Sequence, residues 1–164
     1  MIRIAIVEDE QNYIDKLSEY LDRYKKEYGE QLSVTVFHDG DEISSGYKAQ
    51  FDIILMDIEM KFVNVMSAAE EIRKVDSEVT IIFITNTPQY AVRGYEVGAL
   101  DYILKPVPYF TFSQKLNRAV QKIKKRSKRW ITIPVKGGVM RMELSDIYYI
   151  ESEGHNLIYH TESG

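Results

Sequence analysis

Acidic, hydroxyl and lysine side chains stand directly after several short apolar runs of this 164-residue chain. They are the carboxylates of Glu8-Asp9-Glu10 and Asp57, the hydroxyl of Thr85 and the ammonium of Lys105, which Pro106 follows. Carboxylates held together repel one another unless a cation lies among them, and an oxygen-only set of ligands suits Mg²⁺. A nearby lysine ammonium is suited to contact a phosphoryl oxygen. These residue types indicate magnesium-assisted phosphoryl chemistry, provided that the fold brings them together.

The apolar runs before these residues are typical of strands that are buried on both faces of a parallel sheet. They are short, rich in β-branched residues and nearly continuous at residues 2–7, 51–56 and 79–84. Residues 32–37 alternate more between apolar and polar and suit a strand nearer an edge, and 100–104 is a fifth candidate.

Helical periodicity separates the runs. After Glu10 the apolar residues fall on one helical face that ends at Gly29, a typical position for the residue after a helix. Further helices are predicted over residues 40–48, 66–75, 87–97 and 112–123. This alternation predicts an α/β fold, a doubly wound five-stranded parallel sheet with helices on both faces. Ligands of such sheets bind beside the carboxyl ends of the strands, where the residues described above are expected.

The pattern resembles the receiver domain of bacterial two-component response regulators over about residues 1–125. The resemblance rests on strand-end residues in the same order, namely Glu8-Asp9, Asp57 in LMDIEM, Thr85, Tyr102 and Lys105-Pro106. It implies a flavodoxin-like sheet with strand order 2-1-3-4-5, and a cis peptide bond before Pro106. It also implies a protein that accepts a phosphoryl group from a sensor histidine kinase and is not a turnover enzyme.

The resemblance implies a role for each matching residue. Asp57 would be the phosphoacceptor, and Lys105 would contact the phosphoryl oxygens. Thr85 and Tyr102 would form the switch pair. The Mg²⁺ site would consist of Glu8, Asp9, Asp57 and the main-chain carbonyl of Glu59. The helix at 87–97, the strand at 100–104 and the last helix would form the face of a homodimer.

Two departures from the family pattern follow Asp57. Lys61 stands where most members have proline and Val65 where most have glycine, so the loop beside the phosphorylation site is expected to differ. Asn86 is also larger than the residue that many receivers have there. These departures leave open an alternative, a receiver-like dimerisation or docking module that works without phosphorylation.

Other classes of protein fit the sequence poorly. The absence of cysteine excludes a disulfide framework, a thiolate zinc site and a cysteine nucleophile. The N-terminus lacks the features of a signal peptide, and no apolar stretch approaches ~20 residues, so a cytoplasmic protein without membrane insertion is expected. A phosphatase using the carboxylates of Asp57-Ile58-Glu59 would leave the Glu8-Asp9 pair unexplained.

The C-terminal part differs in pattern and charge. Residues 1–106 hold 11 Lys/Arg and 20 Asp/Glu, whereas residues 107–164 hold 10 and 5. Residues 126–129 are predicted to be a basic linker within the basic run 122–129. Residues 130–164 are rich in strand patterns, with a hairpin turn at Lys136-Gly137-Gly138.

The segment from Leu144 to Thr161 resembles the opening of the LytTR-type DNA-binding domain of the LytR/AlgR class. The resemblance implies transcription control through promoter DNA. Because most of that family's DNA-contacting segments lie further on, residues 130–164 are expected to be an incomplete, all-β part of such a domain. Weak or absent DNA binding is expected for this chain alone.

Overall fold

The computed structural model describes residues 1–58, 62–86, 98–99, 101–127, 130–143, 147–153 and 156–161. The chain separates into two compact units, residues 1–119 and 120–164. The expected division into 1–125, 126–129 and 130–164 places the boundary a few residues later and remains a prediction. The helix expected at 87–97 lies outside the described residues, as do Glu59 and Lys61.

The first unit contains a five-stranded, all-parallel sheet in the order β2-β1-β3-β4-β5, which confirms the predicted fold class and strand order. Its strands are β1 (Ile2–Val7), β2 (Leu32–Phe37), β3 (Ile53–Asp57), β4 (Thr80–Thr85) and β5 (Asp101–Leu104). Its helices are α1 (Gln11–Tyr28), α2 (Gly40–Ser44), α3 (Phe62–Val75) and α5 (Tyr109–Ser127), the last of which runs on into the second unit. The more alternating strand, β2, is indeed at an edge.

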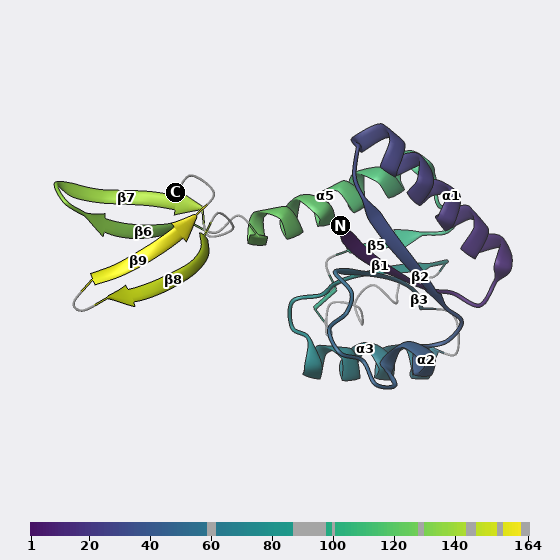
Figure 1. Cartoon of the computed structure of the whole chain (residues 1–164). Coiled ribbons are helices and arrows are strands. Elements are labelled where there is room, and N and C mark those ends of the chain that lie inside the picture. The colour runs from purple at the N-terminus through teal and green to yellow at the C-terminus, as the bar shows by residue number, and fades with distance from the viewer. Residues whose placement is uncertain are drawn as a thin grey trace. The chain divides into compact units, whose positions relative to one another are not determined.

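Helices cover both faces of the sheet, α1 and α5 on one and α2 and α3 on the other (Figure 1). The central strands β3 and β4 are buried at every residue, as near-continuous apolar runs require. Val65, where the family pattern has glycine, is buried in α3 and joins the core beneath β1, β3 and β4. On the other face, the Tyr24 hydroxyl of α1 donates to the Asn117 amide oxygen of α5 at 3.0 Å.

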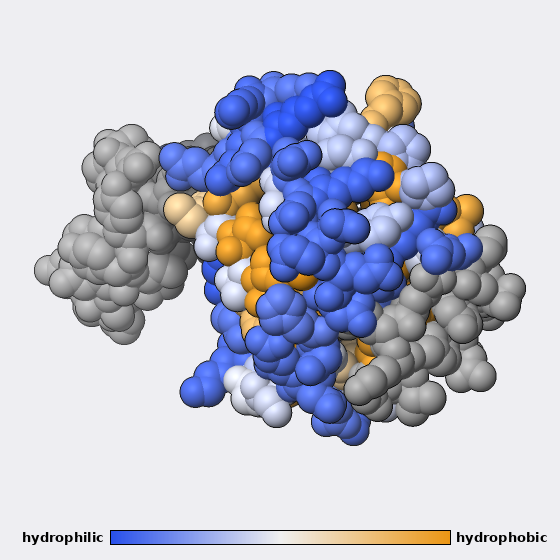
Figure 2. Space-filling model, turned by 90° about the vertical axis from the view of Figure 1, so that its right-hand side faces the viewer, coloured by the Kyte–Doolittle hydropathy of each residue, from blue (hydrophilic) through white to orange (hydrophobic). Residues whose placement is uncertain are grey.

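The face of the first unit that Figure 2 shows is mostly polar in its described residues. Hydrophilic side chains cover most of the described face in Figure 2, with a narrow band of apolar residues between them. Leu104 on the edge strand β5 and Phe110 at the start of α5 are exposed large apolar residues. None of the described helices combines the length and apolarity that a membrane span needs.

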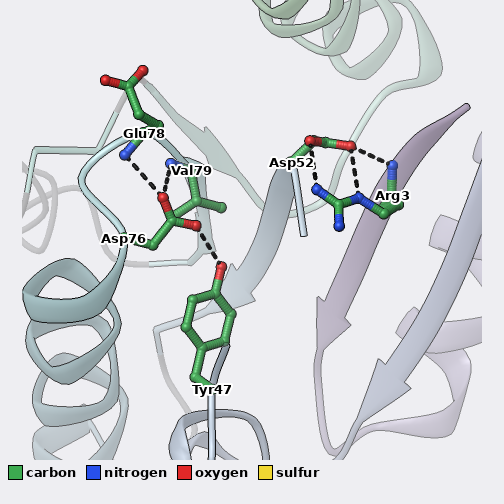
Figure 3. A network of polar contacts seen from close by, with 6 residues as sticks. All are labelled: Arg3, Tyr47, Asp52, Asp76, Glu78 and Val79. Carbon is green, nitrogen blue, oxygen red and sulfur yellow. Dashed lines mark hydrogen bonds and ion pairs between the residues drawn. The ribbon is translucent and has the colours of Figure 1, made fainter. Parts of the chain in front are cut away.

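Polar contacts at the amino ends of the strands tie the sheet to its loops (Figure 3). The Asp52 carboxylate, just before β3, accepts from the backbone N–H and the guanidinium of Arg3 on β1. The Asp76 carboxylate accepts from the Tyr47 hydroxyl and from the backbone N–H groups of Glu78 and Val79. These carboxylates have structural partners, so an acid at a strand end is not by itself a sign of chemistry.

The second unit contains two antiparallel hairpins in its described residues. The first pairs β6 (Trp130–Val135) with β7 (Gly138–Glu143), and the second pairs β8 (Ile147–Glu153) with β9 (Asn156–Thr161). Gly137 and Gly138 have φ of 92° and 158°, so the predicted turn depends on glycine at Gly137. The strand content matches the expected all-β segment.

Candidate functional site

The acidic residues meet where β1 and β3 end. One carboxylate oxygen each from Glu8, Asp9 and Asp57 lies within 4.8 Å of the others. Glu8 follows β1 directly and Asp57 is the last residue of β3, and the parallel pairing of these strands brings the two ends to one edge. Glu8 and Asp57 are buried, whereas Asp9 is exposed. The three carboxylates therefore form a cluster, called the pocket below, that solvent reaches at Asp9.

Lys105 supplies the positive charge of this pocket. Its Nζ lies 3.2 Å from Asp57 Oδ2 and 3.4 Å from Glu8 Oε2, and all three side chains are at most 3% exposed. The ammonium reaches the pocket from the residue after β5, and the Lys105–Pro106 peptide bond is cis, as expected. The nearby carboxylates offset the effect of burial and raise the pKa of Lys105. Lys105 is therefore a cation at neutral pH.

Burial dominates the electrostatics of Glu8. It raises the pKa of Glu8 to about 7, the Glu10 N–H that donates to Glu8 Oε1 at 3.1 Å lowers it, and the Asp57 charge raises it again. An acid whose folded-state pKa is raised binds more protons when folded than when unfolded between pH ~4.5 and ~7. The stability that protonated Glu8 contributes is therefore fully present below pH ~4.5 and is lost as the pH rises to ~7 and above.

We expect this effect to be visible in the Glu8→Gln variant, which carries no charge at this position. The free energy of unfolding of the wild type, relative to this variant, is expected to fall by at most about 3 kcal/mol as the pH rises from ~4.5 to ~7. Urea unfolding of both proteins across this range, without divalent cations, measures the difference. A difference that stays constant with pH would show that Glu8 does not titrate in this window.

The set of donors fits a small divalent cation. Carboxylate oxygens are among the ligands that Mg²⁺ prefers. The ligands of one Mg²⁺ lie at most ~4.2 Å apart, and the Glu8, Asp9 and Asp57 oxygens, all within 4.8 Å of one another, come close to that limit. The open Asp9 side leaves room for the waters that this ion retains. Glu59, whose main-chain carbonyl was expected to be a further ligand, lies outside the described residues.

The expected switch residues lie on β4, which pairs with β3, and on β5, the edge strand beyond β4. Thr85 ends β4 and is buried, and its carbonyl accepts from the Lys105 N–H at 2.8 Å. Tyr102 on β5 is half-buried, pairs in register with Phe83 and packs against the core. Asn86, which is larger than the residue that many receivers have there, is exposed. The geometry places Thr85 beside the pocket, while the switch role of Thr85 and Tyr102 remains a prediction.

Tyr13 is a further residue of the site, and no motif in the sequence indicated it. The Lys105 Nζ lies over its ring at 4.0 Å from the ring centroid. Tyr13 is in the first turn of α1, shortly after the acidic residues. An aromatic residue so close in sequence to Glu8 and Asp9 is the feature that could have indicated its part in the site. Nothing in the local sequence indicated that a lysine from the end of β5 would meet this ring.

Comparisons with known proteins agree with the fold and show the family of the chain. Residues 4–117 match the family model of the response regulator receiver domain. The chain is 27% identical over 97% of its length to an uncharacterised response regulatory protein of Yersinia pestis, covering 61% of that protein. It is 26% identical over 92% of its length to the sensory transduction protein LytT of Bacillus anthracis, covering 65% of it.

A shorter match and the solved structures point the same way. The chain is 40% identical over 76 residues to the transcriptional regulatory protein LytR of Staphylococcus aureus. This match covers 46% of the chain and 29% of that protein. The response regulatory domain of mrkE from Klebsiella pneumoniae has a TM-score of 0.66 at 26% identity, over 76% of this chain and 99% of that one. The HemR receiver domain of Leptospira biflexa has a TM-score of 0.62 at 28% identity, over 73% of this chain and 94% of that one. The chain thus spans less than two thirds of the length of the first relatives that it matches.

Proposed function

The chain belongs to the response regulator receiver family, and from this we propose that Asp57 accepts a phosphoryl group from a phosphohistidine of a sensor histidine kinase. Receiver domains of this family are signalling modules, and relatives of this chain are LytT and LytR proteins. The observation that carries the proposal is the Lys105 ammonium shared between the buried carboxylates of Asp57 and Glu8.

In the proposed reaction an Asp57 carboxylate oxygen attacks the phosphorus atom. The new P–O bond forms as the P–N bond to the kinase imidazole breaks, and the departing nitrogen keeps the electron pair. The imidazole leaves as a neutral ring because its other nitrogen carries a proton before the transfer. Lys105 needs only a small movement from Asp57 Oδ2, 3.2 Å away, to donate to an oxygen of the incoming phosphoryl group. Catalysis of this kind depends on positioning and on electrostatic stabilisation of the transferred group.

The carboxylates of Glu8, Asp9 and Asp57 would hold Mg²⁺ in this site. When bound, the ion neutralises developing charge on the phosphoryl oxygens. It also relieves the repulsion between the carboxylates, which Lys105 offsets only in part.

The proposed signal passes through Thr85. Phosphorylation places new acceptor oxygens at the carboxyl end of β3, next to β4, which ends at Thr85. A Thr85 hydroxyl that moves to donate to the phosphoryl group would leave a space for Tyr102 on β5. This is a local change of charge that biases a two-state element.

The proposed output is a homodimer that controls transcription. The edge strand β5 and helix α5 expose Leu104 and Phe110, which supports their part in a dimer face. The described residues between Trp130 and Thr161 form hairpins, and the sequence of this segment resembles the opening of a LytTR-type DNA-binding domain, which supports promoter DNA as a partner of the whole protein.

A titration with acetyl phosphate and with beryllofluoride, each with and without Mg²⁺, tests the proposal. We expect one phosphoryl group per chain by intact mass, and a shift toward the dimer in analytical ultracentrifugation, both dependent on Mg²⁺. Failure to respond to either reagent would favour the phosphorylation-independent docking module instead.

A further inference from the structure

The Tyr13 ring and the carboxylates of the pocket contact the same ammonium. The Lys105 Nζ lies 4.0 Å from the centroid of the Tyr13 ring, 3.2 Å from Asp57 Oδ2 and 3.4 Å from Glu8 Oε2. The electron-rich face of an aromatic ring attracts a cation, and the attraction grows when the cation is removed from water. Lys105 meets this condition because its side chain is only 3% exposed.

The fold fixes the backbone of Tyr13 in helix α1. Tyr13 lies in the first turn of α1, where its backbone N–H donates to the Glu10 carbonyl at 3.1 Å. The next turns of α1 bury Ile14, Leu17 and Leu21 against the core. The ring is therefore carried by a rigid element, whereas Lys105 has a long side chain with several rotatable bonds.

We propose that Tyr13 is a positioning residue for phosphoryl transfer, whose ring holds the Lys105 ammonium in the pocket within reach of Asp57. The inference rests on the proposed function and adds to it a residue that acts through Lys105. Because the ring already restricts the Lys105 side chain, the ammonium loses less conformational freedom on contact with the incoming phosphoryl group than an unrestrained lysine would lose. The family pattern described above does not include this position.

The contact itself can be tested without phosphorylation. In protein labelled with ¹³C at the lysine ε-carbons, ring currents are expected to shift the Lys105 ε-protons upfield. The Lys105→Met variant assigns the resonance. The shift is expected to persist in Tyr13→Phe, which keeps the ring, and to disappear in Tyr13→Leu. An ordinary lysine shift for wild-type Lys105 would overturn the inference.

The role of the contact is tested by the rate of Asp57 phosphorylation by acetyl phosphate with Mg²⁺. We expect Tyr13→Leu to lower this rate about ten- to thirtyfold, the range for a desolvated cation–π contact, and Tyr13→Phe to stay within about twofold of wild type. Lys16→Met is the matched control, because Lys16 is the other cation near this ring, at 5.7 Å, and is expected to leave the rate unchanged.

A double-mutant cycle separates positioning from a merely structural role. In the Lys105→Met background, Tyr13→Leu is expected to lower the rate by no more than about twofold, because the ring has lost the cation that it holds. An equal loss in both backgrounds, or a wild-type rate for Tyr13→Leu, would overturn the inference. A wild type that takes up no phosphoryl group overturns the proposed function and this role together, even where the ring-current shift is present.

Discussion

The Asp57→Asn variant is expected to take up no phosphoryl group from acetyl phosphate, whereas the wild type takes up one. Asparagine keeps the shape of the side chain at the end of β3 but lacks the carboxylate oxygen that attacks phosphorus. Its amide also offers the pocket one acceptor instead of two. Intact mass after incubation with acetyl phosphate and Mg²⁺ measures the outcome.

Asp52→Asn is the matched control for this variant. It makes the same chemical change just before the same strand, at the end far from the pocket, where the carboxylate pairs with Arg3. We expect it to be phosphorylated at the wild-type rate and to lose at most about 1 kcal/mol of stability, since the pair is partly exposed. Phosphorylation of Asp57→Asn at the wild-type rate would place the acceptor elsewhere.

The second large effect is expected for Lys105→Met, which keeps the length of the side chain and removes its charge. We expect the rate of Asp57 phosphorylation to fall about a hundredfold, the usual loss when one group that stabilises transition-state charge is removed. The buried carboxylates of Glu8 and Asp57 also lose the cation between them, so their mutual repulsion rises. The rate with radiolabelled acetyl phosphate at saturating Mg²⁺ measures the effect.

Lys115→Met provides the control for Lys105→Met. Lys115 lies on α5, and its ammonium pairs with Asp101 at 2.7 Å, at the start of β5 and not in the pocket. The rate is expected to be unchanged in this variant. A Lys105→Met protein that reacts as fast as wild type would show that the ammonium takes no part in the transfer.

Local patterns of apolar and polar residues predicted much of the fold. The near-continuous apolar runs predicted β1, β3 and β4, and the more alternating run correctly predicted β2 as an edge strand. The boundaries were less accurate. The strand predicted at 51–56 begins at Ile53, and the helix predicted from 66 begins at Phe62. Strand and helix ends depend on hydrogen bonds to neighbouring segments, which an apolar pattern does not record.

The sequence predicted that Glu8, Asp9, Asp57 and Lys105 would meet, but it predicted neither Tyr13 nor the electrostatics of the site. The order of strand ends was enough to group Glu8, Asp9, Asp57 and Lys105. It did not show that Glu8 and Asp57 are buried while Asp9 is exposed, nor that burial raises the pKa of Glu8. These properties depend on how far each side chain lies from water, and that distance is set by the loops and helices packed around it.

The sequence by itself determined which chemical groups this protein can use. Periodicity dictates the parallel sheet, and parallel strands carry the residues at their carboxyl ends to one edge. Only the tertiary structure decided that the Lys105 ammonium is shared between Asp57 and Glu8 and lies against the Tyr13 ring. These residues come from the ends of β1, β3 and β5 and the start of α1. These contacts form because the packing of the core brings the elements together. A contact between segments that are distant in sequence produces no local sequence pattern from which it could be predicted.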